Sequence, residues 1–196
     1  MKKYFEESFN KSIDVKKLCL NQGFKPLYIM ADVISNSIKS SGKLLLCGNG
    51  GSAADAQHLA AELLVRLRPH LNRRPIAALT LAQDISTLTA CANDYSFDKI
   101  FERNLEGLGR PGDCLLCLST SGKSKNIVAV MSAAKKMSIN VFGFLGKGGG
   151  ECKELCDQFF LVPSNDTAAI QEAHITAGHA LMEAIEDFVI EKNNES

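Results

Sequence analysis

Short apolar runs alternate with longer stretches of helical pattern along most of the chain. Five runs are apolar almost throughout, at 43–50, 75–81, 113–120, 140–146 and 158–164. Runs of this length without alternation are typical of strands that are buried on both faces. Helical patterns separate them, over 52–68, 84–106 with a break near 93–96, and 124–138. This order predicts an α/β fold, in which helices joined by right-handed crossovers cover a parallel sheet.

Two further helical segments frame this unit. Residues 3–40 predict an N-terminal helical hairpin that is broken near the sequence NQGFKP, and residues 166–192 predict one long C-terminal helix. Asp166 and Thr167 are the candidate N-caps of that last helix. Because no repeat, linker or low-complexity stretch divides the chain, we expect a single domain over 1–196, whose α/β core and C-terminal helix occupy 41–196.

The composition is typical of a globular protein with a substantial core. Of the 196 residues, 45% are hydrophobic, and 22 basic residues balance 22 acidic ones. This balance argues against nucleic-acid and membrane partners, and we expect neither a signal peptide nor a membrane span. The seven cysteines are expected to be free thiols in a reducing cytoplasm. Alternation along a strand should place the thiols of Cys114 and Cys117 on opposite faces of the sheet.

Two turns that follow predicted strands have the chemistry of a phosphate cradle. In GNGGS at 48–52, glycine lets backbone N–H groups approach an anion, and the next helix begins there. The spacing fits neither the dinucleotide fingerprint nor the Walker motif. The second turn, STSGKS at 119–124, offers the hydroxyls of Ser119, Thr120, Ser121 and Ser124. Either turn alone is also compatible with ordinary helix capping, but two of them at strand ends favour a phosphosugar site.

A second candidate site involves two separate helices. His58 and Glu62 are four residues apart and therefore share one helix face, which Arg66 continues. Such a pair is more often a surface ion pair than a pair of metal ligands. On the C-terminal helix, Gln171 and His179 lie about 80° apart around the axis, at ~100° per residue. Two imidazoles, a carboxylate and an amide oxygen form a candidate set of zinc ligands, although glutamine is an unusual one.

His174 competes with Gln171 and His179 for that role, because it lies on the same helix. We expect it to pack or to hydrogen-bond locally instead.

Four segments of the chain carry a family likeness, namely CGNGGSAADAQHLAAEL, ANDYSFDKIF, LSTSGKSKNI and IQEAHITAGH. With them the chain resembles, over nearly its whole length, the phosphoheptose (sedoheptulose-7-phosphate) isomerases of the sugar isomerase (SIS) domain superfamily. The resemblance implies a five-stranded parallel sheet of flavodoxin-like order. It also implies a homotetramer with active sites at subunit interfaces, in which residues 1–40 and the C-terminal helix form the central bundle.

The resemblance also implies roles for individual residues. Asn49, Gly50, Gly51 and Ser52 match the substrate loop of the family, Asn93 and Asp94 a second sugar-contacting turn, and Ser119, Thr120, Ser121 and Ser124 the phosphate loop. One zinc ion per active site is implied, with the ligands His58, Glu62, Gln171 and His179. Of these, Glu62 and Gln171 also match substrate contacts, and Glu62 and His179 match the proton-transfer pair. The chain departs from the family at Ala169, where many relatives have arginine, so we carry over no anchoring role there.

The implied reaction converts D-sedoheptulose 7-phosphate into D-glycero-D-manno-heptose 7-phosphate, the first step towards nucleotide-activated heptose for lipopolysaccharide or capsule. This aldose–ketose isomerisation moves a proton between C1 and C2 through an enediolate. Glu62 is our candidate for the base at carbon and His179 for the group that serves the oxygens, and the reverse assignment stays open.

Three alternatives remain at this point. One is a non-catalytic SIS protein that binds a protein partner, as the replication-initiation regulator DiaA does. Another is an isomerase of a pentose or hexose phosphate, and a third is a sugar-phosphate-sensing transcription regulator. The presence of both Glu62 and His179 favours an enzyme. The first 40 residues are too short and too evenly charged for a DNA-binding module.

Overall fold

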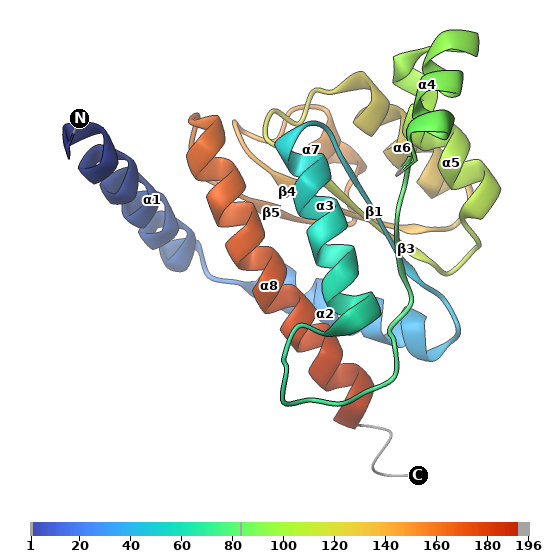
Figure 1. The fold of residues 1–196 in the computed structure, drawn as a ribbon, viewed down its shortest axis with the longest axis horizontal. Helices are drawn as coiled ribbons and strands as arrows, with labels where there is room; N and C mark the ends of the chain where they lie inside the picture. Colours follow the sequence, from blue (N-terminus) through green and yellow to red (C-terminus); the bar gives the residue numbers. More distant parts are fainter. Residues whose placement is uncertain (1, 83, 192–196) are drawn as a thin grey trace.

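The computed structural model describes residues 2–82 and 84–191 of the chain. Helices lie on both sides of a central sheet, and the long α8 crosses one side beside α3 (Figure 1). In chain order the elements are α1 (Lys2–Gln22), α2 (Lys25–Lys39), β1 (Leu44–Gly48), α3 (Gly51–Ala61), the π-helical turn η1 (Glu62–Arg66), β2 (Ala78–Thr80), α4 (Ile85–Asp94), the 3-10 turn η2 (Phe97–Lys99), α5 (Ile100–Leu108), β3 (Cys114–Ser119), α6 (Lys125–Lys136), β4 (Asn140–Leu145), α7 (Cys152–Leu155), β5 (Gln158–Leu161) and α8 (Thr167–Glu191).

The five strands form one parallel sheet in the order β2-β1-β3-β4-β5. This is the flavodoxin-like order that the resemblance implied. The order reverses between β1 and β3, which pair with Cys47 opposite Cys117. In open parallel sheets, ligands bind in the crevice beyond the carboxyl ends of the strands at such a switch point. Here those ends are Gly48 and Ser119, where the two candidate phosphate turns begin.

Side chains alternate along each strand between two apolar layers, which explains why the strand sequences are apolar throughout. Leu44 and Leu46 join a layer with α2, α3 and α8, whereas Leu45 and Cys47 join a layer with α4, α5, α6 and α7. Cys114 and Cys117 fall in opposite layers, as predicted. All seven cysteines are free thiols.

The C-terminal helix begins where its candidate cap predicts. The Oδ1 atom of Asp166 accepts a hydrogen bond from the backbone N–H of Ala169 at 3.0 Å, so Asp166 is the N-cap. Ala169 itself is buried in the apolar layer beneath α8. The predicted end at residue 192 lies just outside the described residues.

Two boundaries differ from the prediction. The strand expected over 75–81 is ordered as a strand only at Ala78–Thr80. The single α-helix expected over 52–68 ends at Ala61 and continues as a π-helical turn, Glu62–Arg66. The side-chain periodicity of the sequence does not predict this change from an α-helix to a π turn, because the π turn is supported by residues further along the chain. The simple α-helical stripe that was predicted to continue to Arg66 therefore stops at Glu62.

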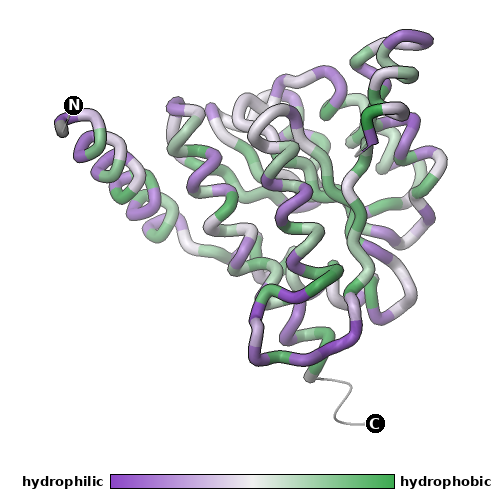
Figure 2. Tube along the Cα trace, viewed as in Figure 1, coloured by the Kyte–Doolittle hydropathy of each residue, from purple (hydrophilic) through white to green (hydrophobic). Residues whose placement is uncertain are grey.

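The N-terminal segment forms the two expected helices, with the break at Gly23, whose φ is 73°. They do not form a closed hairpin, because α1 packs against α8 rather than against α2. The far end of α1 stands away from the rest of the chain and carries apolar residues (Figure 2). Phe5, Phe9 and Ile13, spaced four residues apart, are exposed along it. Among the residues that the structure describes, no helix has the length and apolar character needed to cross a bilayer.

Candidate active site

The GNGGS turn bends sharply from β1 into α3 because glycine occupies its tightest positions. A Cβ atom at Gly48 would lie 2.5 Å from the carbonyl oxygen of Ser52, and Gly50 has φ of 58°. The N–H of Ser52 donates to the carbonyl of Asn49 at 3.1 Å, which closes the turn. Ser52 is buried, and the N-terminal amides of α3 follow directly. The result is a compact loop with backbone donors at the carboxyl end of β1.

The hydroxyl-rich turn after β3 uses some of its hydroxyls to shape itself. The Oγ atom of Ser119 accepts from the N–H of Gly122 at 3.0 Å, and that of Ser121 accepts from the N–H of Lys123 at 3.2 Å. Ser124 begins α6 without using its side chain as a cap. Its hydroxyl and the α6 amides are therefore suited to bind an anion. Lys123 is exposed.

A glycine-rich turn that we did not single out from the sequence supports the hydroxyl-rich turn from behind. A Cβ atom at Gly122, where φ is 63°, would lie 1.8 Å from the carbonyl oxygen of Gly149. The N–H of Cys152 also donates to the carbonyl of Gly122 at 3.0 Å. Only glycine fits at Gly122, and the GKGGG sequence at 146–150 was the available signal for this contact.

An asparagine pair joins the two turns. The side-chain amides of Asn49 and Asn126 donate to each other's oxygen, and both hydrogen bonds are 2.9 Å long. Asn126 is 2% exposed and Asn49 is half-buried, so water is kept from the Asn126 side of the pair. Because buried amides must be paired to be stable, this contact fixes the substrate loop relative to the start of α6. Asn126 was not among the predicted site residues.

The structure brings together three of the four predicted zinc ligands. The Nε2 atom of His58 lies 3.1 Å from Oε1 of Glu62 and 2.7 Å from Nε2 of His179. One ligand atom from each of the three side chains lies within 4.8 Å of the others. The side chain of His58 is 50% exposed and that of Glu62 is 16% exposed, so the cluster opens to solvent. Two imidazoles and a carboxylate in this arrangement fit a catalytic zinc site.

The cluster forms because α8 approaches α3 unusually closely. A Cβ atom at Gly178 would lie 2.7 Å from both methyl carbons of Leu59, so glycine permits this contact. Two turns earlier, the amide of Gln171 lies against the first turn of α3, where a Cβ atom at Gly51 would be 2.6 Å from its Nε2 atom. Gln171, the fourth predicted ligand, thus touches the substrate loop.

His174 stays outside this cluster, as expected. It is fully buried beneath α8, where its Nε2–H donates to the carbonyl of Leu145 at 3.2 Å. Burial lowers the pKa of His174 to about 4, so the ring is neutral at physiological pH.

Asp55 lies close to the cluster, one turn before His58 on α3, and was not singled out from the sequence. Burial raises the pKa of Asp55, which the imidazoles of His58 and His179 partly oppose. Its buried Oδ2 atom has no hydrogen-bond partner among the described residues.

Asn93 and Asp94 are not brought to the cluster within one chain. They lie exposed at the end of α4, where the amide of Asn93 donates to Asp94 at 2.8 Å. Helix α4 packs against α5 and η2, on the opposite side of the molecule from α8 (Figure 1).

Comparisons with known proteins identify the family of the chain. The family model described as the SIS domain matches residues 9–146. The chain is 49% identical to a phosphoheptose isomerase of Paramagnetospirillum magneticum over 83% of each chain, and 43% identical to one of Clostridium acetobutylicum over 95% of each. The structure matches phosphoheptose isomerases from Neisseria gonorrhoeae (36% identity, covering 95% of this chain and 98% of that one) and Francisella tularensis (32%, covering 94% and 97%), each with a TM-score of 0.88. The chain belongs to the SIS domain family and, within it, to the phosphoheptose isomerases.

Proposed function

We propose that the chain catalyses the aldose–ketose isomerisation of D-sedoheptulose 7-phosphate to D-glycero-D-manno-heptose 7-phosphate. The observation that carries this proposal is the contact of His58 and Glu62, at the end of α3, with His179 of α8. An acid–base cluster and a phosphate-binding turn in one domain are what a sugar-phosphate isomerase requires. A non-catalytic role finds no support, because both proton-transfer residues are present and close together.

The phosphate is assigned to the turn at 119–124. Serine and threonine hydroxyls and the first amides of α6 supply several directed donors, and the helix N-terminus adds partial positive charge. Binding energy gained at this non-reacting end orients the sugar, so that C1 and C2 are held against the acid–base cluster. Asn49 and Gln171, which line the substrate loop, are assigned to the sugar hydroxyls.

Proton transfer is assigned to Glu62 and His179. One of them removes the proton from C1 of the ketose, and the resulting enediolate is reprotonated at C2. The other moves protons to and from the two neighbouring oxygens. Our preferred assignment gives the carbon to Glu62 and the oxygens to His179.

The residues that would hold zinc are His58, Glu62, Gln171 and His179. When bound, the ion would stabilise the negative charge that develops on the sugar oxygen. Glu62 is then shared between metal binding and proton transfer, so its position must be controlled closely.

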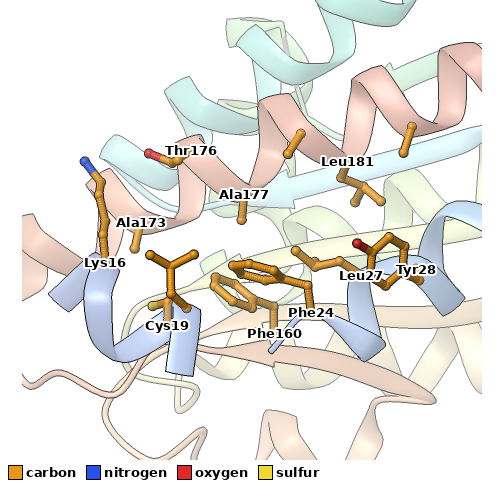
Figure 3. A pocket seen from close by; sticks show the side chains of 13 residues that line it. Lys16, Cys19, Phe24, Leu27, Tyr28, Phe160, Ala173, Thr176, Ala177 and Leu181 are labelled. Carbon is orange, nitrogen blue, oxygen red and sulfur yellow. The ribbon is translucent and has the colours of Figure 1, made fainter. Parts of the chain in front are cut away.

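We also propose that the active unit is a homotetramer. A groove of about 310 Å³ runs between α1, α2 and α8. In Figure 3, Phe24, Leu27 and Phe160 lie on one side of this groove and small residues of α8 on the other. The exposed Phe5, Phe9 and Ile13 of α1 from a second copy offer a complementary apolar surface. From the resemblance, we also assign Asn93 and Asp94 to sugar contacts.

The free thiols are consistent with a reducing cytoplasm, where we place the reaction. By family analogy, its product would enter the synthesis of nucleotide-activated heptose.

The test is turnover of sedoheptulose 7-phosphate by the purified protein in D₂O, with deuterium at C2 of the product measured by NMR. We expect Glu62→Gln and His179→Gln to lower kcat by about 100-fold or more. The matched controls are Glu183→Gln and His70→Gln, whose side chains are exposed. They should retain wild-type rates. Wild-type rates in both Glu62→Gln and His179→Gln would remove these residues from the mechanism.

A further inference from the structure

A buried network of charged groups lies behind the acid–base cluster. Glu186 of α8 is fully buried, and both of its carboxylate oxygens accept from arginines. The Nε–H of Arg68 donates to Oε2 at 2.6 Å, and the Nε–H of Arg73 donates to Oε1. Both arginines come from the segment that follows the π turn η1. Removing the charge of one partner would leave an uncompensated charge in the interior, so Glu186 needs the positive charges of the arginines.

Arg73 extends this network to the backbone of the site. Its Nη2 atom donates to the carbonyl of Glu62 at 2.9 Å, and its Nη1 atom donates to the carbonyl of Leu63 at 2.8 Å. The side chain of Arg73 is only 6% exposed. Because a guanidinium is planar and rigid, these hydrogen bonds fix the two carbonyls relative to Glu186 in one geometry.

The two carbonyls belong to the first residues of the π turn. A π-helical turn is rare and recurs at functional sites, and it needs support to compete with an α-helical turn. Here the turn begins at Glu62, the residue whose carboxylate contacts His58. Arg73 therefore supports the local backbone conformation from which the Glu62 side chain projects.

The same network also includes α8, the helix that carries His179. Glu186 lies seven residues after His179 on α8, about two helical turns away. Arg73 thus ties the main chain at Glu62 directly to the helix that carries His179. Gly178 allows α8 to approach α3 at Leu59, and this network fixes the start of η1 to α8 two helical turns further along.

We propose that Arg73, held by Glu186, is a positioning residue that sets the placement of Glu62 relative to His179. The expected effect on kcat rests on the proposed function. The expected effect on metal binding does not require turnover, because the same placement of Glu62 and His179 also governs metal binding. Arg68 provides a matched control. It pairs with the same carboxylate, but its second bond goes to Asp187 of α8 rather than to the π turn.

The test compares Arg73→Lys with Arg68→Lys in the full-length protein. Lysine keeps the positive charge but cannot hold Glu186 and two carbonyls at once. We expect Arg73→Lys to lower kcat by about 10- to 100-fold with KM changed less than about threefold. Arg68→Lys should change kcat less than about threefold, even where both variants lose similar thermal stability. Equal loss of kcat in both variants, or no loss in Arg73→Lys, would overturn the proposal.

A second readout does not depend on turnover. Zinc affinity of the metal-free proteins is measured by competition with a chromophoric chelator. We expect Arg73→Lys to weaken zinc binding by about 10-fold and Arg68→Lys to leave it unchanged. If the wild type does not isomerise sedoheptulose 7-phosphate, the zinc measurement still tests the role of Arg73. Failure of the proposed function and failure of the proposal for Arg73 can therefore be distinguished.

A third variant changes the carboxylate that holds Arg73 instead of Arg73 itself. Glu186→Gln keeps an acceptor for Arg73 but removes the charge, and we expect a smaller loss of kcat and of zinc affinity in the same direction. A folded Glu186→Gln protein with wild-type kcat and wild-type zinc affinity would contradict the proposal.

Discussion

Replacing Gly178 by alanine tests whether close helix contact brings the acid–base cluster together. The added methyl would lie 2.7 Å from both methyl carbons of Leu59, whereas carbon atoms pack at about 3.5–4.0 Å. Leu59 is fully buried and cannot simply rotate away. Most of the missing distance, about 1 Å, must therefore come from a shift of α8 away from α3, and His179 moves with α8.

The substitution is expected to affect both the stability and the activity of the protein. Overpacking costs about 1–3 kcal/mol of stability, and alanine recovers about 0.5–1 kcal/mol over glycine in a helix. The net loss is therefore about 0–2.5 kcal/mol, within the stability of a typical domain. A displacement of about 1 Å at a reacting group costs about 100-fold in rate, or about 2.7 kcal/mol in the barrier. The protein should thus stay folded while its kcat falls about 100-fold.

The assay is kcat for sedoheptulose 7-phosphate together with urea unfolding. The matched control is Gly107→Ala in α5, where a Cβ atom would meet open space. It should keep wild-type kcat and gain about 0.5–1 kcal/mol of stability. Adding Leu59→Ala to Gly178→Ala should restore part of the lost kcat. A Gly178→Ala protein with wild-type kcat would show that this contact does not set the geometry of the site.

Two further predictions concern other parts of the site. Asn126→Ala removes the two hydrogen bonds that join Asn126 to the half-buried side chain of Asn49, so we expect a loss of about 1–3 kcal/mol in stability and a KM raised about 10-fold, measured by urea unfolding and steady-state kinetics. His174→Gln tests the buried imidazole, whose pKa is lowered to about 4. The unfolded chain binds a proton near pH 6.5 and the folded chain does not, so wild-type stability should fall by about 2 kcal/mol between pH 7 and pH 5. In urea unfolding of the metal-free proteins at both pH values, the variant should lack this part of the fall in stability. An identical fall in the wild type and the variant would contradict the prediction.

The sequence predicts those parts of the site that depend on local pattern. Apolar runs locate the strands, and glycine and hydroxyl residues mark the two turns where β1 and β3 end. Helical spacing predicts that His58 and Glu62 share a face, and Asp166 predicts the start of α8. Each of these signals lies within a few residues of the feature that it predicts.

The remaining features depend on contacts between distant positions. Gly178 is an unremarkable helical glycine until Leu59 is seen against it. The π turn at Glu62 has no signature in side-chain periodicity, because its support comes from Arg73. Asn126 looks like any polar residue in the first turn of a helix until Asn49 is placed beside it. None of these pairings follows from spacing along the chain.

The most direct test of the proposed site is a crystal structure of the protein with sedoheptulose 7-phosphate bound. We predict phosphate oxygens within about 2.6–3.2 Å of the hydroxyls or amides of residues 119–124, and C1 and C2 within about 3.5 Å of the side chains of Glu62 and His179. A phosphate bound away from that turn, or a sugar whose C1 and C2 contact neither side chain, would contradict the proposed mechanism.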